Sequence, residues 1–132
     1  MKKTSFIMQF FVALSLLLSS SIGAFSGSLI IEVPDDPEPT TETIAYQCDL
    51  GKVKERVEVT YLNAGDISLV DFMWNGRRIV GSNVLSASGS KYVGDAYIWW
   101  ISKNEATLYD LINDPNEEKP ILCVEEKDNA VK

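Results

Sequence analysis

The sequence predicts an all-β fold, a small antiparallel β-barrel of about eight strands closed by one disulfide. From residue 44 onward, short runs of strand-forming residues recur at spacings of about ten residues, with turn residues between them. No window of about 11 residues has the hydrophobic period of a helix, apart from the apolar stretch near the start of the chain. The sequence contains two cysteines, which lie near the two ends of this strand-rich region. Closing the sheet would remove the exposed edges that make small sheets aggregate.

Residues 1–26 have the layout of a secretory signal peptide. Two lysines form a basic start, an apolar run covers residues 6–18, and small residues follow up to Ser26. The run is shorter than the roughly 20 residues that a membrane-spanning helix needs. We expect cleavage after Ser26 or Ala24, export to the periplasm, and no membrane span. Because neither cysteine lies near the cleavage site, we expect no lipid anchor.

The rest of the chain divides into three parts. Residues 27–43 are acidic and rich in proline, which predicts a flexible or extended lead-in, with residues 29–33 as a short strand. Residues 44–125 form the expected barrel domain, and residues 126–132 form a charged tail.

The expected strands of the domain have alternating or β-branched residues and end at turn signals. Asn75-Gly76 is the strongest of these signals, because a type I′ hairpin turn needs a positive φ at both central residues. The expected strands are residues 57–61, 67–74, 77–80, 91–93, 96–101, 106–112 and 121–124.

Composition excludes several classes of function. The sequence has no histidine, which removes Ser-His-Asp and Cys-His catalysis and the commonest metal ligand. The formal charge is −7, and it becomes −9 when Lys2 and Lys3 leave with the signal peptide. Such a charge repels nucleic acid and favours a cationic partner. We expect a binding protein rather than an enzyme, with no cofactor.

Cys48 and Cys123 are expected to form a disulfide, because an exported domain with an even number of cysteines usually pairs them. A metal site is the alternative. It is a poor one, because two thiolates lack a histidine or a second cysteine pair to complete it.

The segment SASGSKY differs from the strands around it, because most of its residues are small. By composition alone it is an ordinary Ser/Gly turn, in which the glycine allows a positive φ or the close approach of a partner. A serine nucleophile is a weaker reading, because no histidine can act as its base. The residues that could bind a partner here are Ser86, Ser88, Gly89, Ser90, Lys91 and Tyr92.

From Ser86 to Tyr109 the chain reads SASGSKYVGDAYIWWISKNEATLY. This resembles the signature of the bacterial inhibitors of c-type lysozyme, the periplasmic and membrane-bound lysozyme inhibitors. That family has a SASG[AS][RK]Y loop, then an aromatic-Trp-x-Lys-Gly segment that leads into an E-A-T-[LV]-Y strand. Tyr46-Gln47-Cys48 resembles the family's first cysteine strand, and Cys123 supplies the second cysteine.

The resemblance implies an eight-stranded barrel that inserts this loop into the active-site cleft of a c-type lysozyme. Ser88 would approach the catalytic carboxylates, and an ammonium group would pair with one of them. C-type lysozymes are generally cationic, so an acidic inhibitor would meet them faster. The second binding segment that the resemblance implies is Trp100, Ser102 and Lys103.

The chain departs from the family pattern at this second segment. The family's lysine falls on Ser102 and its glycine falls on Lys103, so the ammonium has moved by one position. We expect Lys103 to substitute for it in part. Lys91 is the other candidate cation, or else a solvated lysine. The departure keeps open a rival function, an envelope ligand-binding barrel with the same scaffold and no inhibitory contact.

The tryptophans receive separate predictions. Trp99 and Trp100 are adjacent on a strand and therefore face opposite sides, one in the core and the other in rim packing or an interface. Trp74 precedes a tight turn and is expected to plug the end of the barrel rather than to bind sugar. Tyr92 and Tyr97 are expected to support the loop by packing.

Overall fold

The structure is a computed structural model that describes residue 23, residues 26–34 and residues 36–127. The expected signal peptide at residues 1–26 lies outside the described residues except for Gly23 and Ser26. The expected charged tail lies outside them from residue 128 onward. None of the described residues belongs to a helix long and apolar enough to cross a membrane.

The chain divides into two units, residues 1–31 and residues 32–132. In the first unit the described residues form no regular secondary structure, and Leu29 and Ile30 are exposed. The strand predicted at residues 29–33 is therefore wrong. Its composition is that of a strand, but a strand also needs a neighbour for its backbone hydrogen bonds, which composition does not provide.

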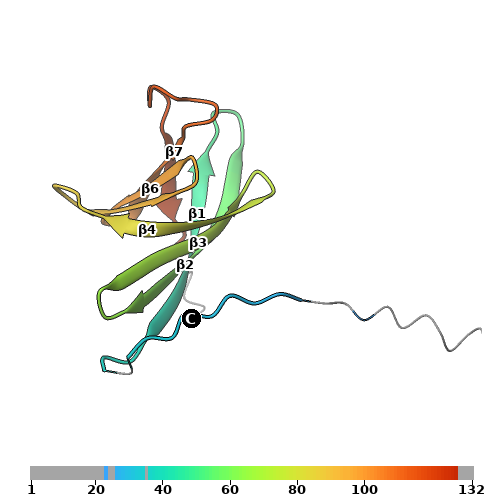
Figure 1. Ribbon diagram of the computed structural model, residues 1–132. Helices are drawn as coiled ribbons and strands as arrows, with labels where there is room; N and C mark the ends of the chain where they lie inside the picture. The colour runs from blue at the N-terminus through green and yellow to red at the C-terminus, as the bar shows by residue number, and fades with distance from the viewer. Residues whose placement is uncertain (1–22, 24–25, 35, 128–132) are drawn as a thin grey trace, which may run out of the picture. The chain divides into compact units, whose positions relative to one another are not determined.

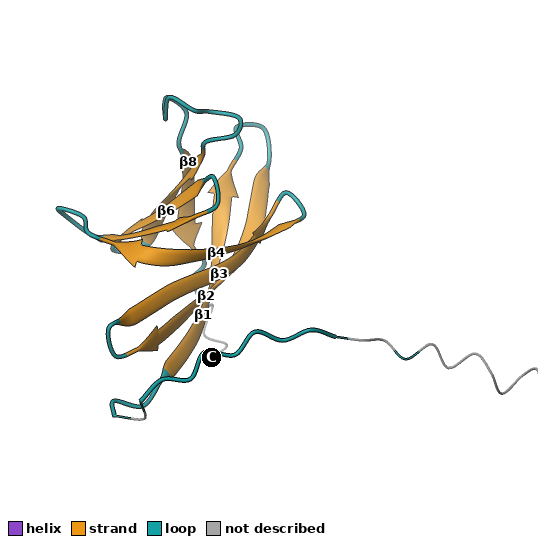
Figure 2. Cartoon of the chain, in the orientation of Figure 1, coloured by secondary structure: helices purple, strands orange, loops and turns teal. Residues whose placement is uncertain are grey.

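The second unit is a closed barrel of eight antiparallel strands, each hydrogen-bonded to the strands before and after it in the chain (Figure 1). Strands and turns account for all of its regular structure (Figure 2). The predicted all-β barrel is confirmed. The strands are β1 (Thr40–Asp49), β2 (Lys54–Ala64), β3 (Ile67–Trp74), β4 (Arg77–Val84), β5 (Ser90–Gly94), β6 (Tyr97–Ser102), β7 (Glu105–Asp110) and β8 (Ile121–Glu125).

Strand β1 begins at Thr40, earlier than the start expected near Ile44, so the proline-rich lead-in ends at Pro39. The first residues of β1 pair with the end of β2. Threonine suits this position because β-branched side chains favour extended backbone. The hydroxyls of Thr43 and Thr60 lie 2.9 Å apart across the two strands.

Turn residues end the strands for local reasons. Asn75 and Gly76 have φ values of 48° and 73°, which confirms the turn predicted between β3 and β4. Strand β7 ends at Asp110, before the expected end at Ile112. The Asp110 carboxylate accepts hydrogen bonds from the backbone N–H groups of Ile112 and Asn113, at 3.0 and 3.2 Å, and so turns the chain out of the sheet.

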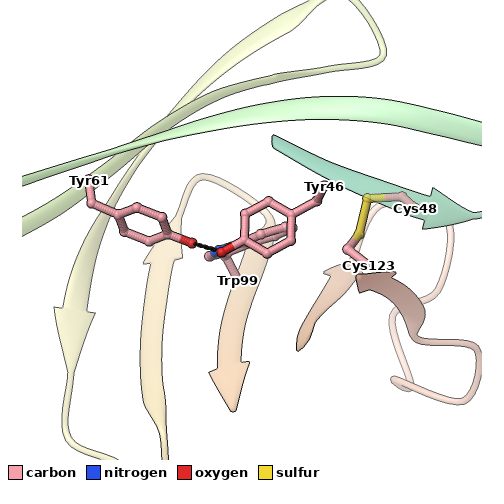
Figure 3. The surroundings of a disulfide bond; sticks show 5 residues. All are labelled: Tyr46, Cys48, Tyr61, Trp99 and Cys123. Carbon is pink, nitrogen blue, oxygen red and sulfur yellow. Dashed lines mark hydrogen bonds between the residues drawn. A yellow bond between two sulfur atoms is a disulfide. The ribbon is translucent and has the colours of Figure 1, made fainter. Parts of the chain in front are cut away.

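Trp99 lies at the centre of the core and is only 1% exposed. Tyr46 packs edge-on against it, with ring centroids 5.1 Å apart, and Phe72 packs against it at 5.3 Å. Its indole N–H donates a hydrogen bond of 2.9 Å to the hydroxyl oxygen of Tyr61, which lies 2.8 Å from the Tyr46 hydroxyl (Figure 3). Burial raises the pKa of both tyrosines. The barrel interior is thus occupied by aromatic side chains from several strands.

The first and last strands meet at the seam that closes the barrel. Strands β1 and β8 pair over Tyr46, Gln47 and Cys48 only, and Cys48 lies directly opposite Cys123. The two cysteines form a disulfide, as predicted (Figure 3). The disulfide therefore links the two ends of the domain at the β1–β8 pairing, which is shorter than the pairing of β1 with β2.

Candidate functional site

Two connections that carry the predicted binding residues lie at the same end of the barrel. The β4–β5 loop covers residues 85–89, and the β6–β7 turn is formed by Lys103 and Asn104. Because successive strands alternate in direction, the connections that follow even-numbered strands share one end. The β4–β5 loop projects from the barrel at the left of Figures 1 and 2. The fold therefore brings the two predicted segments to one face.

Hydrogen bonds within the β4–β5 loop fix its shape. The Ser86 hydroxyl donates to the carbonyl oxygens of Ser88 and Gly89, at 3.1 and 3.2 Å. Gly89 has a φ of 64°, and a Cβ atom at this position would lie 2.2 Å from the carbonyl oxygen of Ile101. Glycine is thus required by the close approach of the protein's own strand β6, before any partner is considered.

Trp100 supports the loop from outside the barrel. Its indole nitrogen donates a hydrogen bond of 2.9 Å to the carbonyl oxygen of Ser88. The Lys91 ammonium lies 4.9 Å from the centre of the Trp100 ring, in a cation–π contact between register partners. Trp99 points into the core and Trp100 lies on the outer side, half-buried, which confirms their predicted opposite facing.

Ser88 is exposed, and its carbonyl oxygen accepts the hydrogen bond from Trp100. Among the residues that the structure describes, no hydrogen bond includes this hydroxyl. Ser90 is also exposed and begins β5. A hydroxyl on a rigid, projecting loop can donate to a carboxylate of a partner without first breaking an internal bond.

Tyr92 is part of the core rather than of the exposed surface. It is buried, its hydroxyl lies 3.0 Å from the hydroxyl of Ser68, and its ring packs against Tyr61. Tyr97 is buried as well. Both tyrosines therefore pack in the core, so the prediction of Tyr92 as a partner-binding residue is wrong, and Tyr97 lies at the end of β6 away from the loop.

The departure from the family pattern lies in the β6–β7 turn. Ser102 ends β6, opposite Glu105, and Lys103 follows with a φ of 58°. Glycine adopts this conformation freely, whereas other residues avoid it at a cost of about 1–2 kcal/mol. Lys103 thus stands in a turn position suited to the family's glycine, with its side chain exposed. None of the ion pairs among the described residues includes Lys103.

Leu85 is a loop residue that sequence reasoning missed. It is 100% exposed, the highest value of any large apolar residue that the structure describes. The signal in the sequence was a single leucine directly before a run of small residues. Its exposure could not be deduced from that pattern, because a leucine at a strand end is as often packed inward.

A second surface feature is an open groove of about 580 Å³ on the outer side of β2 and β3. Its lining includes Val57 and Phe72 together with arginine and carboxylate side chains. Arg56 pairs with Glu58, and the Arg78 guanidinium pairs with another carboxylate on the rim. These pairs raise the pKa of both arginines. The charges of the groove are therefore compensated within the protein, unlike the free hydroxyl and ammonium at the loop end.

The described residues contain no group of three or more potential metal ligands from histidine, cysteine, aspartate and glutamate. The roles that the site can perform are hydrogen bonding, charge pairing and apolar contact. These are the chemistry of a binding surface.

Comparison with known proteins gives consistent matches. The family model described as membrane-bound lysozyme-inhibitor of c-type lysozyme matches residues 46–117. A Pseudomonas aeruginosa protein named membrane-bound lysozyme inhibitor of C-type lysozyme is 42% identical over 80 residues, 60% of this chain and 61% of that protein. A Cupriavidus necator protein of the same name is 36% identical over 78 residues, 59% of this chain and 60% of that protein. The match thus spans about three fifths of these relatives.

A solved structure is also similar. It is the crystal structure of Pseudomonas aeruginosa MliC in complex with hen egg white lysozyme, with a TM-score of 0.63 and 33% sequence identity. The similarity covers 78% of this chain and all of that chain.

Proposed function

This chain belongs to the family of membrane-bound lysozyme-inhibitors of c-type lysozyme, and on that premise we propose that it is an exported protein inhibitor of c-type lysozyme. The observation that carries the proposal is the β4–β5 loop, whose backbone accepts hydrogen bonds from Ser86 and Trp100 while the Ser88 hydroxyl makes none among the described residues. The solved relative's complex with hen egg white lysozyme supports the choice of partner. The protein would act by occluding the cleft and would perform no reaction itself.

In the proposed complex, the loop enters the active-site cleft and the Ser88 hydroxyl donates a hydrogen bond to a catalytic carboxylate. Retaining glycosidases place two carboxyl groups close together around the bond that they cleave. Hydrogen bonds to an ionised carboxylate are roughly twice as strong as neutral ones. Because the loop is already ordered by Ser86 and Trp100, little conformational entropy is lost when it binds.

Lys103 is the ammonium that we assign to the second carboxylate. It lies in the turn at the same end of the barrel as Ser88 and has an exposed side chain. Lys91 is less free, because its ammonium already lies over the ring of Trp100. The flexible stem of Lys103 can make up for the displacement of one residue from the family position.

The net charge supports a cationic partner. The full sequence has a formal charge of −7. Opposite charges on two proteins speed their encounter, and salt screens this effect over about 8 Å at physiological ionic strength. Binding to lysozyme should therefore weaken as salt is added.

A rival function is an envelope ligand-binding barrel that shares the scaffold but makes no inhibitory contact. The groove on β2 and β3 is the surface that such a ligand could use. Two features argue against it. The charged rims of the groove are already paired, and the interior is filled by Trp99 and its aromatic neighbours.

The proposed location is the periplasm, reached through the signal peptide at residues 1–26. We infer that neither Cys48 nor Cys123 carries a lipid, because the two are joined in a disulfide. Mass spectrometry of the protein purified from its own envelope would test both inferences.

The test of function is the residual activity of hen and human lysozyme in the presence of the purified mature protein. We expect inhibition near equimolar ratio, and binding that weakens with salt. An absence of inhibition of several c-type lysozymes at large excess would refute the proposal. If a small ligand instead bound in the groove, the rival would be favoured.

Two variants locate the contact. Ser88→Ala and Lys103→Ala should each weaken inhibition, and only the lysine effect should diminish at high salt. Ser82→Ala and Lys52→Ala are matched controls, since Ser82 is exposed on β4 and Lys52 lies in the β1–β2 turn at the opposite end. Unchanged inhibition by both loop-end variants would refute the assignment of this face.

A further inference from the structure

Leu85 has an exposure that the fold itself does not require. It is 100% exposed on a loop whose other residues are small, while the apolar side chains inside the barrel are buried almost completely. Leaving a leucine in water forgoes the free energy that burial would provide. A fully exposed leucine therefore adds nothing to the stability of the free protein.

The residues that follow Leu85 in the loop are held by contacts within the protein. Ser86, the next residue, is fixed by its hydrogen bonds to Ser88 and Gly89. Gly89 in turn lies against the carbonyl of Ile101 in β6. The interior of the barrel is already occupied by Trp99 and its aromatic neighbours. The outward position of Leu85 is thus a property of an ordered loop.

Apolar surface continues from Leu85 onto the barrel. Val84 precedes it and is 38% exposed. Val84 is the register partner of Lys91, which is the partner of Trp100. Leu85 and Val84 are thus adjacent at the base of the loop, and Lys91 lies between Val84 and Trp100 with its ammonium over the Trp100 ring.

The loop alone is too small for a stable complex. Stable protein–protein interfaces bury about 800 Å² on each partner and include about 20–30 residues a side. Their affinity depends on a few large side chains that become fully buried, whereas small polar residues contribute less. The loop offers hydroxyls and a glycine, and Leu85 is its one large side chain.

We propose that Leu85 is the apolar anchor of the inhibitory surface, and that it is buried against apolar surface of the lysozyme beside the cleft that Ser88 enters. This inference rests on the proposed function. Lysozyme keeps its catalytic acid protonated by placing it in a hydrophobic pocket, so the cleft contains apolar surface near the carboxylates. Val84 and Trp100 extend the same contact at the loop base.

The apolar anchor and the charged groups of the protein have different roles in binding. Lys103 and the net charge speed encounter, and salt screens their effect. An apolar contact acts mainly on the rate of dissociation and is not screened. Leu85 would then determine how long the complex lasts. The size of the apolar surface that receives Leu85 would determine which lysozymes are bound for longest.

The test compares Leu85→Ser with Leu50→Ser, by the Kd and dissociation rate of the hen egg white lysozyme complex. Leu50 is a matched control, because it is a 42% exposed leucine in the β1–β2 turn at the opposite end of the barrel. We expect Leu85→Ser to weaken binding by about tenfold to a hundredfold, the factor that burial of one leucine provides. The loss should be in the dissociation rate and equal at low and high salt. Leu85→Met should retain most of the affinity, because it conserves volume.

Each outcome distinguishes this inference from the function on which it rests. If the parent protein binds lysozyme and Leu85→Ser binds within about twofold of it, the anchor is refuted and the inhibitor function stands. A loss that disappears at high salt, or that Leu50→Ser shares, also refutes the anchor. If the parent protein does not bind any c-type lysozyme, both proposals fail together.

Discussion

The indole nitrogen of Trp100 lies 2.9 Å from the carbonyl oxygen of Ser88, so a side chain on β6 holds the middle of the β4–β5 loop. The same ring carries the Lys91 ammonium 4.9 Å above it. One residue of the second binding segment is therefore a support for the first segment. The two motifs of the sequence form one structural unit.

Trp100→Phe should weaken lysozyme inhibition and lower the free energy of unfolding by no more than about 0.5–1.5 kcal/mol, the contribution of one exposed hydrogen bond. The variant keeps an aromatic ring beneath Lys91 but removes the hydrogen bond to Ser88, which orders the loop. Binding must then re-order the loop, and a cost of about 0.5–1.5 kcal/mol for this corresponds to roughly a twofold to tenfold loss of affinity. Urea unfolding and an inhibition assay would measure the two effects separately.

The neighbouring Trp99→Phe supplies the contrast. It should reduce the free energy of unfolding by about 1–3 kcal/mol, because the buried hydroxyl of Tyr61 loses its donor and the core loses volume. An equal loss of stability in both tryptophan variants would contradict the division between core and loop support.

Gly89→Ala should displace the loop and abolish most of the inhibition. The added Cβ would lie 2.2 Å from the Ile101 carbonyl oxygen, and the φ of 64° is unfavourable for alanine. Gly76→Ala is the matched control, because Gly76 has a φ of 73° with open space around its Cβ position and lies in the β3–β4 turn at the opposite end of the barrel. It should lose a little stability and no inhibition. Equal inhibition by both variants would show that the packing of the loop against β6 is unimportant.

Replacing Cys48 and Cys123 by serine should lower the free energy of unfolding by about 2–4 kcal/mol. The disulfide restrains the unfolded chain over a sequence separation of 75 residues and secures a seam with few backbone pairs. Denaturant titration of the variant, and of the parent protein with a reductant, would measure this. Matching midpoints for the oxidised parent and the serine variant would contradict it.

Tyr61→Phe should lower the free energy of unfolding by about 1–3 kcal/mol, because the Trp99 indole N–H would stay buried without an acceptor. Tyr109→Phe is the matched control, since Tyr109 is half-buried and none of the hydrogen bonds among the described residues includes its hydroxyl. A fall of the same size in both variants would refute the role of the buried bond.

The same tyrosines predict how stability depends on pH. Burial raises the pKa of Tyr46 and Tyr61 above that of an unfolded tyrosine, so folding favours the neutral phenol. The contribution of the two tyrosines to the free energy of unfolding is complete below about pH 10. It is lost as the pH rises further, because the tyrosines of the unfolded chain then ionise first. Unfolding measured by circular dichroism from neutral to alkaline pH should follow this course. Stability that stays constant well above pH 10 would contradict it.

Much of the barrel could be predicted from the sequence, because its signals are local. Alternation along β2 and the Asn75-Gly76 pair concern residues that are neighbours in the chain. The start of β1 was missed because its threonines follow several prolines. Residues 29–33 have the composition of a strand, and only the three-dimensional structure shows that they form none.

The sequence predicts which segment forms the candidate site, but it does not predict the contacts that hold this loop in place. The small residues from Ser86 onward identified the loop, yet the bond from Trp100 to Ser88 joins residues on different strands. The exposure of Leu85 depends in the same way on where the rest of the loop is fixed. The hydrogen bonds between Tyr46, Tyr61 and Trp99 come from three strands, and no spacing in the sequence predicts them.

The order of the strands around the barrel has a consequence for how the protein folds. Every strand pairs with its successor in the chain, except that β1 must also pair with β8. Hairpins can thus form one after another as the chain emerges from its N-terminal end. Cys48 belongs to the first strand and Cys123 to the last, so the native disulfide can form only when the whole domain is present. Oxidation of this pair is therefore a late event that marks a completed barrel, and a chain cut short before β8 would carry an unpaired thiol.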